Sequence, residues 1–258
     1  MFRYGIERRD QALVERDYTK SWSEPVGASL TGRRTRFQKL FGRLGLYRSI
    51  DNRKLFLHHI FHTIVSFQPR LVLELGSGNG INLLALAVLY PQAKQFVGVE
   101  LTKQGVETSL LVLKNPPLKE LVYLTECNEK TIAERIKSAN IQFIQADLRK
   151  LPFQNDSFDF SFSCCVFEQI PRGYLDGFRE AYRVTKGQSL FLEEFREAQE
   201  NIFQRIHLVN VDYFRASFQE VAKAGFKILK FEPMPVTKIK FTYGSLLCEA
   251  NKDESFSP

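Results

Sequence analysis

Apolar and polar positions along the chain predict strands and helices in alternation. Short apolar runs, typical of buried strands, are followed or preceded by stretches with helical periodicity. The runs lie at 71–75, 95–100, 141–146, 157–165 and 189–193, and two later strands are expected at 226–231 and 238–248. Such alternation indicates an α/β fold, with a largely parallel sheet that helices cover on both faces.

The residues before this alternating region have a different pattern. Residues 1–20 predict an amphipathic helix, 21–32 a loop, 33–47 a second helix and 52–67 a third helix capped by Asp51. Residues 113–140 are longer than one crossover needs and predict two extra short helices. The predicted organisation is therefore a helical N-terminal arm at 1–69, a main domain at 70–252 and a polar tail at 253–258.

Composition limits the possible classes of protein. The 258 residues are 44% hydrophobic and 25% charged, which suits one large α/β domain with an appendage. No apolar run is long enough to span a bilayer, and the first residues lack the apolar core of a signal peptide. The four cysteines show no CxxC spacing. We therefore expect a cytoplasmic protein with reduced thiols, no membrane span and no metal site.

The positive charge is concentrated at the N-terminus. Residues 1–70 hold 14 Lys+Arg and 6 Asp+Glu, a net charge of +8. The rest of the chain holds 22 Lys+Arg and 23 Asp+Glu, a net charge of −1. A basic arm of this kind can attract phosphate, nucleic acid, anionic lipid or an acidic partner. A solvated helical surface is the other interpretation, and composition alone leaves both open.

The strongest motif is the turn after the first predicted strand. Gly76, Gly78 and Gly80 alternate with Ser77 and Asn79, and a helical pattern follows. Glycines allow positive φ, and the helix N-terminus offers free N–H groups to a ligand. A dinucleotide site has G-x-G-x-x-G spacing instead. With Glu74 two residues before Gly76, the segment resembles the first motif of class I S-adenosylmethionine (SAM) methyltransferases.

Later landmarks follow the order of that family. Glu100, followed by Leu101, ends the second strand, where an acid can accept hydrogen bonds from both ribose hydroxyls. The resemblance implies that the acid of the segment Ala146-Asp147-Leu148 binds the adenine amino group, and that its neighbours enclose the ring. A solvent-facing glutamate and a helix N-cap aspartate are the plainer interpretations of Glu100 and Asp147.

The resemblance also implies where the rest of the site lies. The end of the fourth strand, at Ser163 and Cys164, would pass beneath the methionine part of the cofactor. Many small-molecule members have a histidine where Gln169 stands, so this departure leaves the general base open, with Glu168 and Glu194 as candidates. The arm and the segment after strand five would cover the acceptor like a lid, through Tyr18, Trp22, Gln169, Phe195, His207 and Tyr213.

The resemblance covers about residues 71–252. It implies a Rossmann-like three-layer sandwich with a seven-stranded, mostly parallel sheet in which strand seven is antiparallel. The expected function is transfer of a methyl group from SAM to a small-molecule acceptor, by in-line displacement. The alternatives are an RNA or protein methyltransferase that uses the basic arm, and a SAM-binding protein without catalysis. The glycine spacing and Asp147 argue against an NAD-dependent oxidoreductase.

Overall fold

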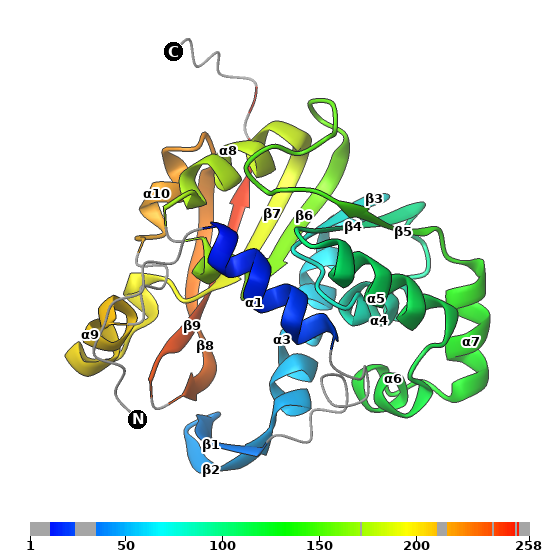
Figure 1. Cartoon of the computed structure of the whole chain (residues 1–258), viewed down its shortest axis with the longest axis horizontal. Coiled ribbons are helices and arrows are strands. Elements are labelled where there is room, and N and C mark those ends of the chain that lie inside the picture. The colour runs from blue at the N-terminus through cyan, green and yellow to red at the C-terminus, as the bar shows by residue number, and fades with distance from the viewer. Residues whose placement is uncertain are drawn as a thin grey trace.

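The computed structural model of the chain describes residues 11–23, 35–170, 172–210, 216–238, 240–250 and 252. Over these residues nine strands form one mixed sheet in the order β2-β1-β8-β9-β7-β6-β3-β4-β5 (Figure 1). The strands are β1 (Thr35–Leu40), β2 (Arg43–Arg48), β3 (Leu71–Leu75), β4 (Gln95–Glu100), β5 (Ile141–Gln145), β6 (Phe158–Cys164), β7 (Thr185–Glu193), β8 (Lys227–Lys238) and β9 (Thr242–Glu249).

Helices connect and cover these strands. They are α1 (Gln11–Ser23), α3 (Ser49–Phe67), α4 (Ile81–Leu89), α5 (Lys103–Lys114), α6 (Leu118–Thr125), α7 (Glu129–Ser138), α8 (Tyr174–Val184), α9 (Ile202–Asn210) and α10 (Gln219–Ala222), with short 3₁₀ turns η1 (Phe167–Gln169) and η2 (Arg196–Ala198). The two short helices expected within 113–140 are confirmed as α6 and α7.

The parallel half of the sheet is the part that the apolar runs predict well. Strands β7, β6, β3, β4 and β5 pair in parallel, and β9 is antiparallel to both of its neighbours, as expected. From β3 the chain moves outward to β4 and β5, then returns to β6 on the other side of β3. Such a reversal opens a crevice at the carboxyl ends of the strands, where α/β proteins commonly bind ligands.

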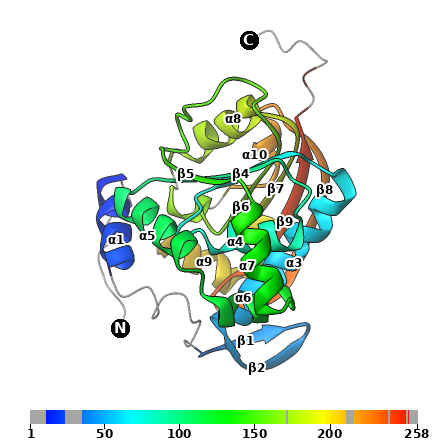
Figure 2. The ribbon, with the colours of Figure 1, turned by 90° about the vertical axis from the view of Figure 1, so that its right-hand side faces the viewer.

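Alternating side chains divide the core into two layers on opposite faces of the sheet. In β3, Val72 packs with α3, α4, α6 and α7, whereas Leu73 and Leu75 pack with α8 and α10. The adjacent β6 contributes Phe160 and Phe162 to the first of these layers. Figure 2 shows α8 and α10 on the opposite side of the sheet from α4 and α7. This three-layer arrangement agrees with the predicted fold class.

The antiparallel half corrects the prediction for the N-terminal arm. Residues 33–47, predicted as a helix, contain the hairpin β1–β2, so the sheet has nine strands where seven were expected. The turn at Phe41-Gly42 has φ of 47° and 79°, which a right-handed helix cannot contain. Strand β1 pairs with β8, so partners about 200 residues away in sequence override the local helical periodicity.

Other differences concern helix ends. Helix α3 begins at Ser49 after Arg48, so the prediction of Asp51 as N-cap is wrong; its carboxylate instead accepts the Arg48 N–H at 2.8 Å from within the first turn. The helix expected at 196–207 is divided into η2 and α9, and the one expected at 212–224 is described only as α10. No helix among the described residues is long and apolar enough to cross a membrane.

Candidate active site

A cavity of about 710 Å³ lies at the carboxyl ends of β3, β4, β5 and β6. The turn after β3 and the first residues after β4, β5 and β6 line one side of it. Val14 and Tyr18 of α1 line it from the N-terminal arm, and α1 packs against α5 beside it (Figure 2). Topology therefore brings together, around one partly open cavity, segments that are far apart in sequence.

The glycine turn forms the floor of this cavity. Gly76, Gly78 and Gly80 all have positive φ, at 75°, 56° and 75°, so the expected role of these glycines in turning the backbone is confirmed. A Cβ added to Gly76 would lie 2.5 Å from a methyl group of Val166. The Ser77 hydroxyl is buried and has no hydrogen-bond partner among the described residues. A cradle this close, with an unused polar atom, fits a ligand that lies against the main chain.

Glu74 lies behind the turn and does not line the cavity. One of its oxygens accepts a hydrogen bond from the Asn82 side chain at 2.8 Å, and the other is buried without a partner. Burial is the main cause that raises the pKa of Glu74 to about 8. Asn82, which lines the cavity, also accepts a 2.7 Å hydrogen bond from Arg53 of α3. The chain Arg53–Asn82–Glu74 thus fixes the first turn of α4.

Glu100 ends β4 at the cavity wall. One carboxylate oxygen accepts hydrogen bonds from the N–H and hydroxyl of Thr102, at 3.1 and 2.9 Å, while the other has only a 3.3 Å contact from the Gly78 N–H. Burial raises the pKa of this carboxyl above its usual range. A Cβ at Gly105 would lie 2.5 Å from the Glu100 side chain, so the missing side chain at Gly105 makes room for the acid.

Asp147 follows β5 and lines the same cavity as Glu100. The Arg149 side chain forms two-pronged hydrogen bonds to its carboxylate, the shortest at 2.6 Å. Burial opposes ionisation of Asp147, but these hydrogen bonds outweigh it and lower the pKa. The charge of Glu15 on α1 acts on Arg149 as well, so the arm and this loop are electrostatically linked.

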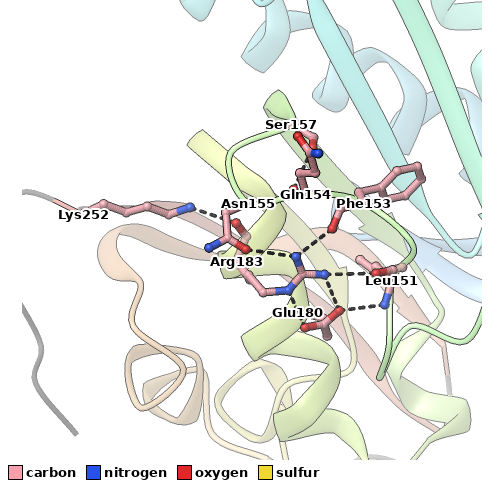
Figure 3. Close-up of polar contacts among 8 residues, drawn as sticks. All are labelled: Leu151, Phe153, Gln154, Asn155, Ser157, Glu180, Arg183 and Lys252. Carbon is pink, nitrogen blue, oxygen red and sulfur yellow. Dashed lines mark hydrogen bonds and ion pairs between the residues drawn. The ribbon is translucent and has the colours of Figure 1, made fainter.

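The loop after Asp147 is held in place by Arg183 of α8 (Figure 3). Its guanidinium donates to both oxygens of Glu180, each at 2.7 Å, and to the carbonyl oxygens of Leu151 and Phe153. Glu180 in turn accepts the Leu151 N–H at 2.7 Å. A planar donor group is needed for this set of bonds. Arg183 therefore positions the loop that follows Asp147.

The segment after β6 is clamped from β7. Glu193 is fully buried and accepts hydrogen bonds from the Ser163 hydroxyl at 2.6 Å and from the N–H groups of Val166 and Phe167 at 3.0 Å. Cys165, between these donors, has a φ of 59° although it is not glycine. Strained backbone of this kind costs about 1–3 kcal/mol and persists only where the surroundings enforce it. The clamp thereby fixes which side chains of this segment face the cavity.

Two acids meet at the cavity wall beyond this clamp. Glu168 lines the cavity, whereas Glu194 is fully buried behind it. Burial first, then the charge of Glu168, raises the pKa of Glu194 to about 11. Neither Glu194 oxygen accepts a hydrogen bond from the described residues, and one Glu168 oxygen is also buried without a donor. Glu194 therefore remains protonated in the folded protein at neutral pH.

Most sequence-predicted site residues meet at this cavity. Those that line it are Gly76, Ser77, Gly78, Asn79, Glu100, Leu101, Asp147, Leu148, Cys164, Tyr18, Glu168, Gln169 and His207. The predicted residues Glu74, Gly80, Ala146, Ser163 and Glu194 are not among the residues that line it. Phe195 is a correction: it is fully buried and packs against Phe231, with ring centroids 5.9 Å apart, so it does not face the cavity. The Trp22 side chain and Tyr213 lie outside the described part of the chain.

Sequence reasoning missed a second group of lining residues. Arg36, Arg53, Lys238 and Lys240 bring positive charge to the cavity, and Tyr243 lines it beside them. The only sequence signal was the excess of basic residues in the N-terminal arm, which includes Arg36 and Arg53. Nothing local to residues 238–243 predicts that they reach the site.

Comparison with known proteins agrees with this geometry. Residues 73–192 match the model of a protein family described as a methyltransferase domain. The solved structure of the cyclase SpnF superposes with a TM-score of 0.65 at 14% identity, over 96% of this chain and 98% of that one. No curated protein matches the chain significantly.

Two methyltransferases of known structure also have this fold. Magnesium protoporphyrin IX methyltransferase from Synechocystis PCC 6803, solved with bound S-adenosylhomocysteine (SAH), superposes with a TM-score of 0.58 at 12% identity, over 93% of this chain and 99% of that one. Geranyl diphosphate C-methyltransferase from Streptomyces coelicolor A3(2) gives 0.56 at 10% identity, over 92% and 98%. Residues 73–192 therefore contain a methyltransferase domain, and the fold and the glycine turn support a SAM-dependent enzyme of class I.

Proposed function

We propose that this enzyme transfers a methyl group from SAM to a small-molecule acceptor held in the same cavity. One observation carries the proposal: the glycine turn, Glu100 and Asp147 line one partly open cavity together with Glu168 and Gln169. Residues expected to bind the cofactor and residues expected to contact the acceptor therefore line a single cavity of about 710 Å³. Such a volume suits small ligands.

The residues present fit the cofactor. The turn from Gly76 to Asn79 would hold the methionine part, and the buried hydroxyl of Ser77 supplies an unused donor and acceptor there. The weakly engaged oxygen of Glu100 would accept hydrogen bonds from ribose hydroxyls. Asp147, with Leu101 and Leu148, would enclose the adenine. The relatives solved with SAH or with SAM bound support this assignment.

The cofactor would supply an electrophilic methyl group on a sulfonium. The protein's task is then to hold the nucleophile in line, and positioning of this kind can contribute about 7–11 kcal/mol. A base is needed only where the acceptor carries a proton, and it typically adds ~10²–10⁴-fold. We assign that role to Glu168, because it lines the cavity, whereas Glu194 is buried behind the lining.

The arm at 1–69 would act as a lid over the cavity. Val14 is buried there, and Tyr18 lines the volume from α1. Gln169 of η1 and His207 of α9 also line the cavity and would contact the acceptor. A cytoplasmic location, expected from the sequence, belongs to this proposal. An RNA or protein acceptor is the second candidate, and the positive charge of the arm is its only support. The cavity itself has the size of a small-molecule site.

Because a cyclase shares this fold, the test must follow the methyl group itself. The purified enzyme is incubated with methyl-labelled SAM and with separate pools of small-molecule acceptors, RNA and protein. The account predicts label transfer only to small molecules, together with release of SAH, and loss of both in Glu100→Ala. Label transferred to RNA or protein instead, with no small molecule labelled, would contradict the proposal.

A further inference from the structure

The cavity continues into a second, smaller pocket of about 230 Å³ between α3, β1 and the β8–β9 hairpin. Arg36, Arg53 and Lys238 line both volumes. No aspartate or glutamate of the described chain lines the smaller pocket. Positive charge is therefore concentrated at this end, away from Glu100 and Asp147.

Strand register explains how these cations meet. Gln38 of β1 pairs with Lys238 of β8, and Arg36 lies two residues before Gln38 on the same face of its strand. The buried side-chain amides of Gln38 and Asn52 exchange two hydrogen bonds, at 2.6 and 3.0 Å. That exchange fixes β1 to α3, where Arg53 follows Asn52. Three separate segments are thereby held around one pocket.

Two cations of this pocket act electrostatically on buried acids, Arg53 on Glu74 and Lys238 on Glu194. Among the described residues, Arg36, Arg53 and Lys238 form no ion pair, whereas Lys39, on the opposite face of β1, lies 3.9 Å from Glu200. Lys238 donates a hydrogen bond to the Tyr243 hydroxyl and lies 4.6 Å from the centre of that ring. Cations that line a partly enclosed space without an ion pair offer charge-assisted hydrogen bonds to an anionic ligand.

The other wall of the pocket is apolar. Ile50, Phe56, Leu57 and Ile60 of α3 line it, and the Phe56 ring packs edge-on against Tyr243 with centroids 5.1 Å apart. A ligand that satisfies both walls combines an anionic group with an apolar body. Inorganic phosphate alone would leave the apolar wall unused.

We propose that this pocket binds the anionic group of the methyl acceptor, so the substrate is a small organic anion with an apolar body. The inference rests on the proposed function, because the pocket opens into the proposed cofactor cavity. Carboxylate and phosphate share the chemistry that Arg36 and Lys238 recognise. Arg53 also adjoins the glycine turn through Asn82, so Arg36 and Lys238 are the residues that test the acceptor site alone.

The experiment is calorimetric titration of the full-length, SAH-saturated enzyme with three matched probes: 2-naphthoate, 2-naphthyl phosphate and neutral 2-naphthamide. We expect at least one anion to bind roughly tenfold or more tightly than the amide, in line with a charge-assisted hydrogen bond. The better of the two anions then identifies the group as carboxylate or phosphate. Arg36→Met and Lys238→Met should each weaken that anion roughly tenfold, and Lys39→Met should change it less than about twofold.

Failure of the inference is distinct from failure of the proposed function. If SAH binds but no anion binds more tightly than the amide, the anion pocket is wrong and the cofactor assignment stands. An equal loss of anion affinity in Lys39→Met and Arg36→Met would also overturn the pocket. So would binding of a short single-stranded RNA that both variants weaken equally. If SAH does not bind, the probes are titrated without it; anion-selective binding lost in Arg36→Met would then support the pocket, and its absence would overturn it.

Discussion

The two ends of the cavity present different chemical groups. At the proposed cofactor end, the turn residues 76–79 and the acids Glu100 and Asp147 line the space. At the other end, the side chains of Arg36 and Lys238 do so, on antiparallel strands. One end offers acceptors to hydroxyl and amino groups, and the other offers donors to anions.

The comparison teaches how topology distributes chemistry. In the parallel half, every strand ends at the same edge, so the loops that follow converge without any special side-chain pairing. In the antiparallel half, convergence depends on register and on the Gln38–Asn52 contact. The first end is therefore set by the order of strands, and the second by individual side chains.

The largest expected effect is at the glycine turn. Gly76→Ala should abolish measurable SAH binding, because φ of 75° strains an alanine and its Cβ would lie 2.5 Å from Val166, which also lines the cavity. Gly42→Ala is the matched control: φ there is 79°, but nothing lies within 4 Å of the added atom. Calorimetry should show normal SAH affinity in Gly42→Ala, and normal affinity in Gly76→Ala would contradict the account of the floor.

The next largest effect is expected for Glu194 and concerns the pH dependence of stability. Folded Glu194, with a pKa raised from 4.5 to about 11, keeps a proton that the unfolded chain releases above pH 4.5. The stability it contributes is complete below that pH and is lost as pH rises, by about 1.4 kcal/mol per pH unit. Glu194→Gln removes this group, so the decline in unfolding free energy between pH 5 and 8 should flatten accordingly in denaturant titrations.

Glu107→Gln, on the exposed side of α5, is the control for that slope and should leave it as in the wild type. An unaltered slope in Glu194→Gln would show that Glu194 is ionised in the folded enzyme.

A smaller effect is expected at the ribose acid. Glu100→Ala should weaken SAH by about 10–100-fold, the range for losing charged hydrogen bonds of 1.5–3 kcal/mol. The structure should survive, since Thr102 still caps α5 through the hydrogen bond that its hydroxyl accepts from the Gly105 N–H at 3.1 Å. Glu107→Ala provides the matched control. SAH affinity that is equal in both variants would remove Glu100 from the cofactor site.

The smallest effect concerns the attachment of the hairpin. Gln38→Ala leaves the buried Asn52 amide unpaired and should lower the unfolding free energy by about 1–3 kcal/mol. The double variant Gln38→Leu/Asn52→Leu should recover most of that loss, because no unpaired polar group remains. SAH affinity should not change in either variant; a tenfold loss would mean that the two ends are not separable.

Much of the cofactor end could be predicted from sequence because its signals are local. The bounds of β3 and β4 are as predicted, and the glycine turn and Glu100 follow them directly. The acceptor end could not be predicted. Arg36 and Lys238 are about 200 residues apart and meet only through the pairing of β1 with β8. That pairing was not predicted, because the local periodicity of residues 33–47 favours a helix.

The error at Phe195 has a similar origin. An aromatic residue just after β7 fits a lid over an acceptor, but the backbone places it beneath Phe231. Direction of a side chain after a strand depends on the turn that follows, here η2. Residue type alone does not encode that direction.

The most direct test measures both ligands on both ends. SAH and the tighter-binding naphthyl anion are each titrated calorimetrically into wild type, Glu100→Ala and the double variant Arg36→Met/Lys238→Met. The account predicts that Glu100→Ala loses SAH and retains the anion, and that the double variant retains SAH and loses the anion. Loss of both ligands in either variant, with the fold intact by circular dichroism, would contradict a cavity with two chemically distinct ends.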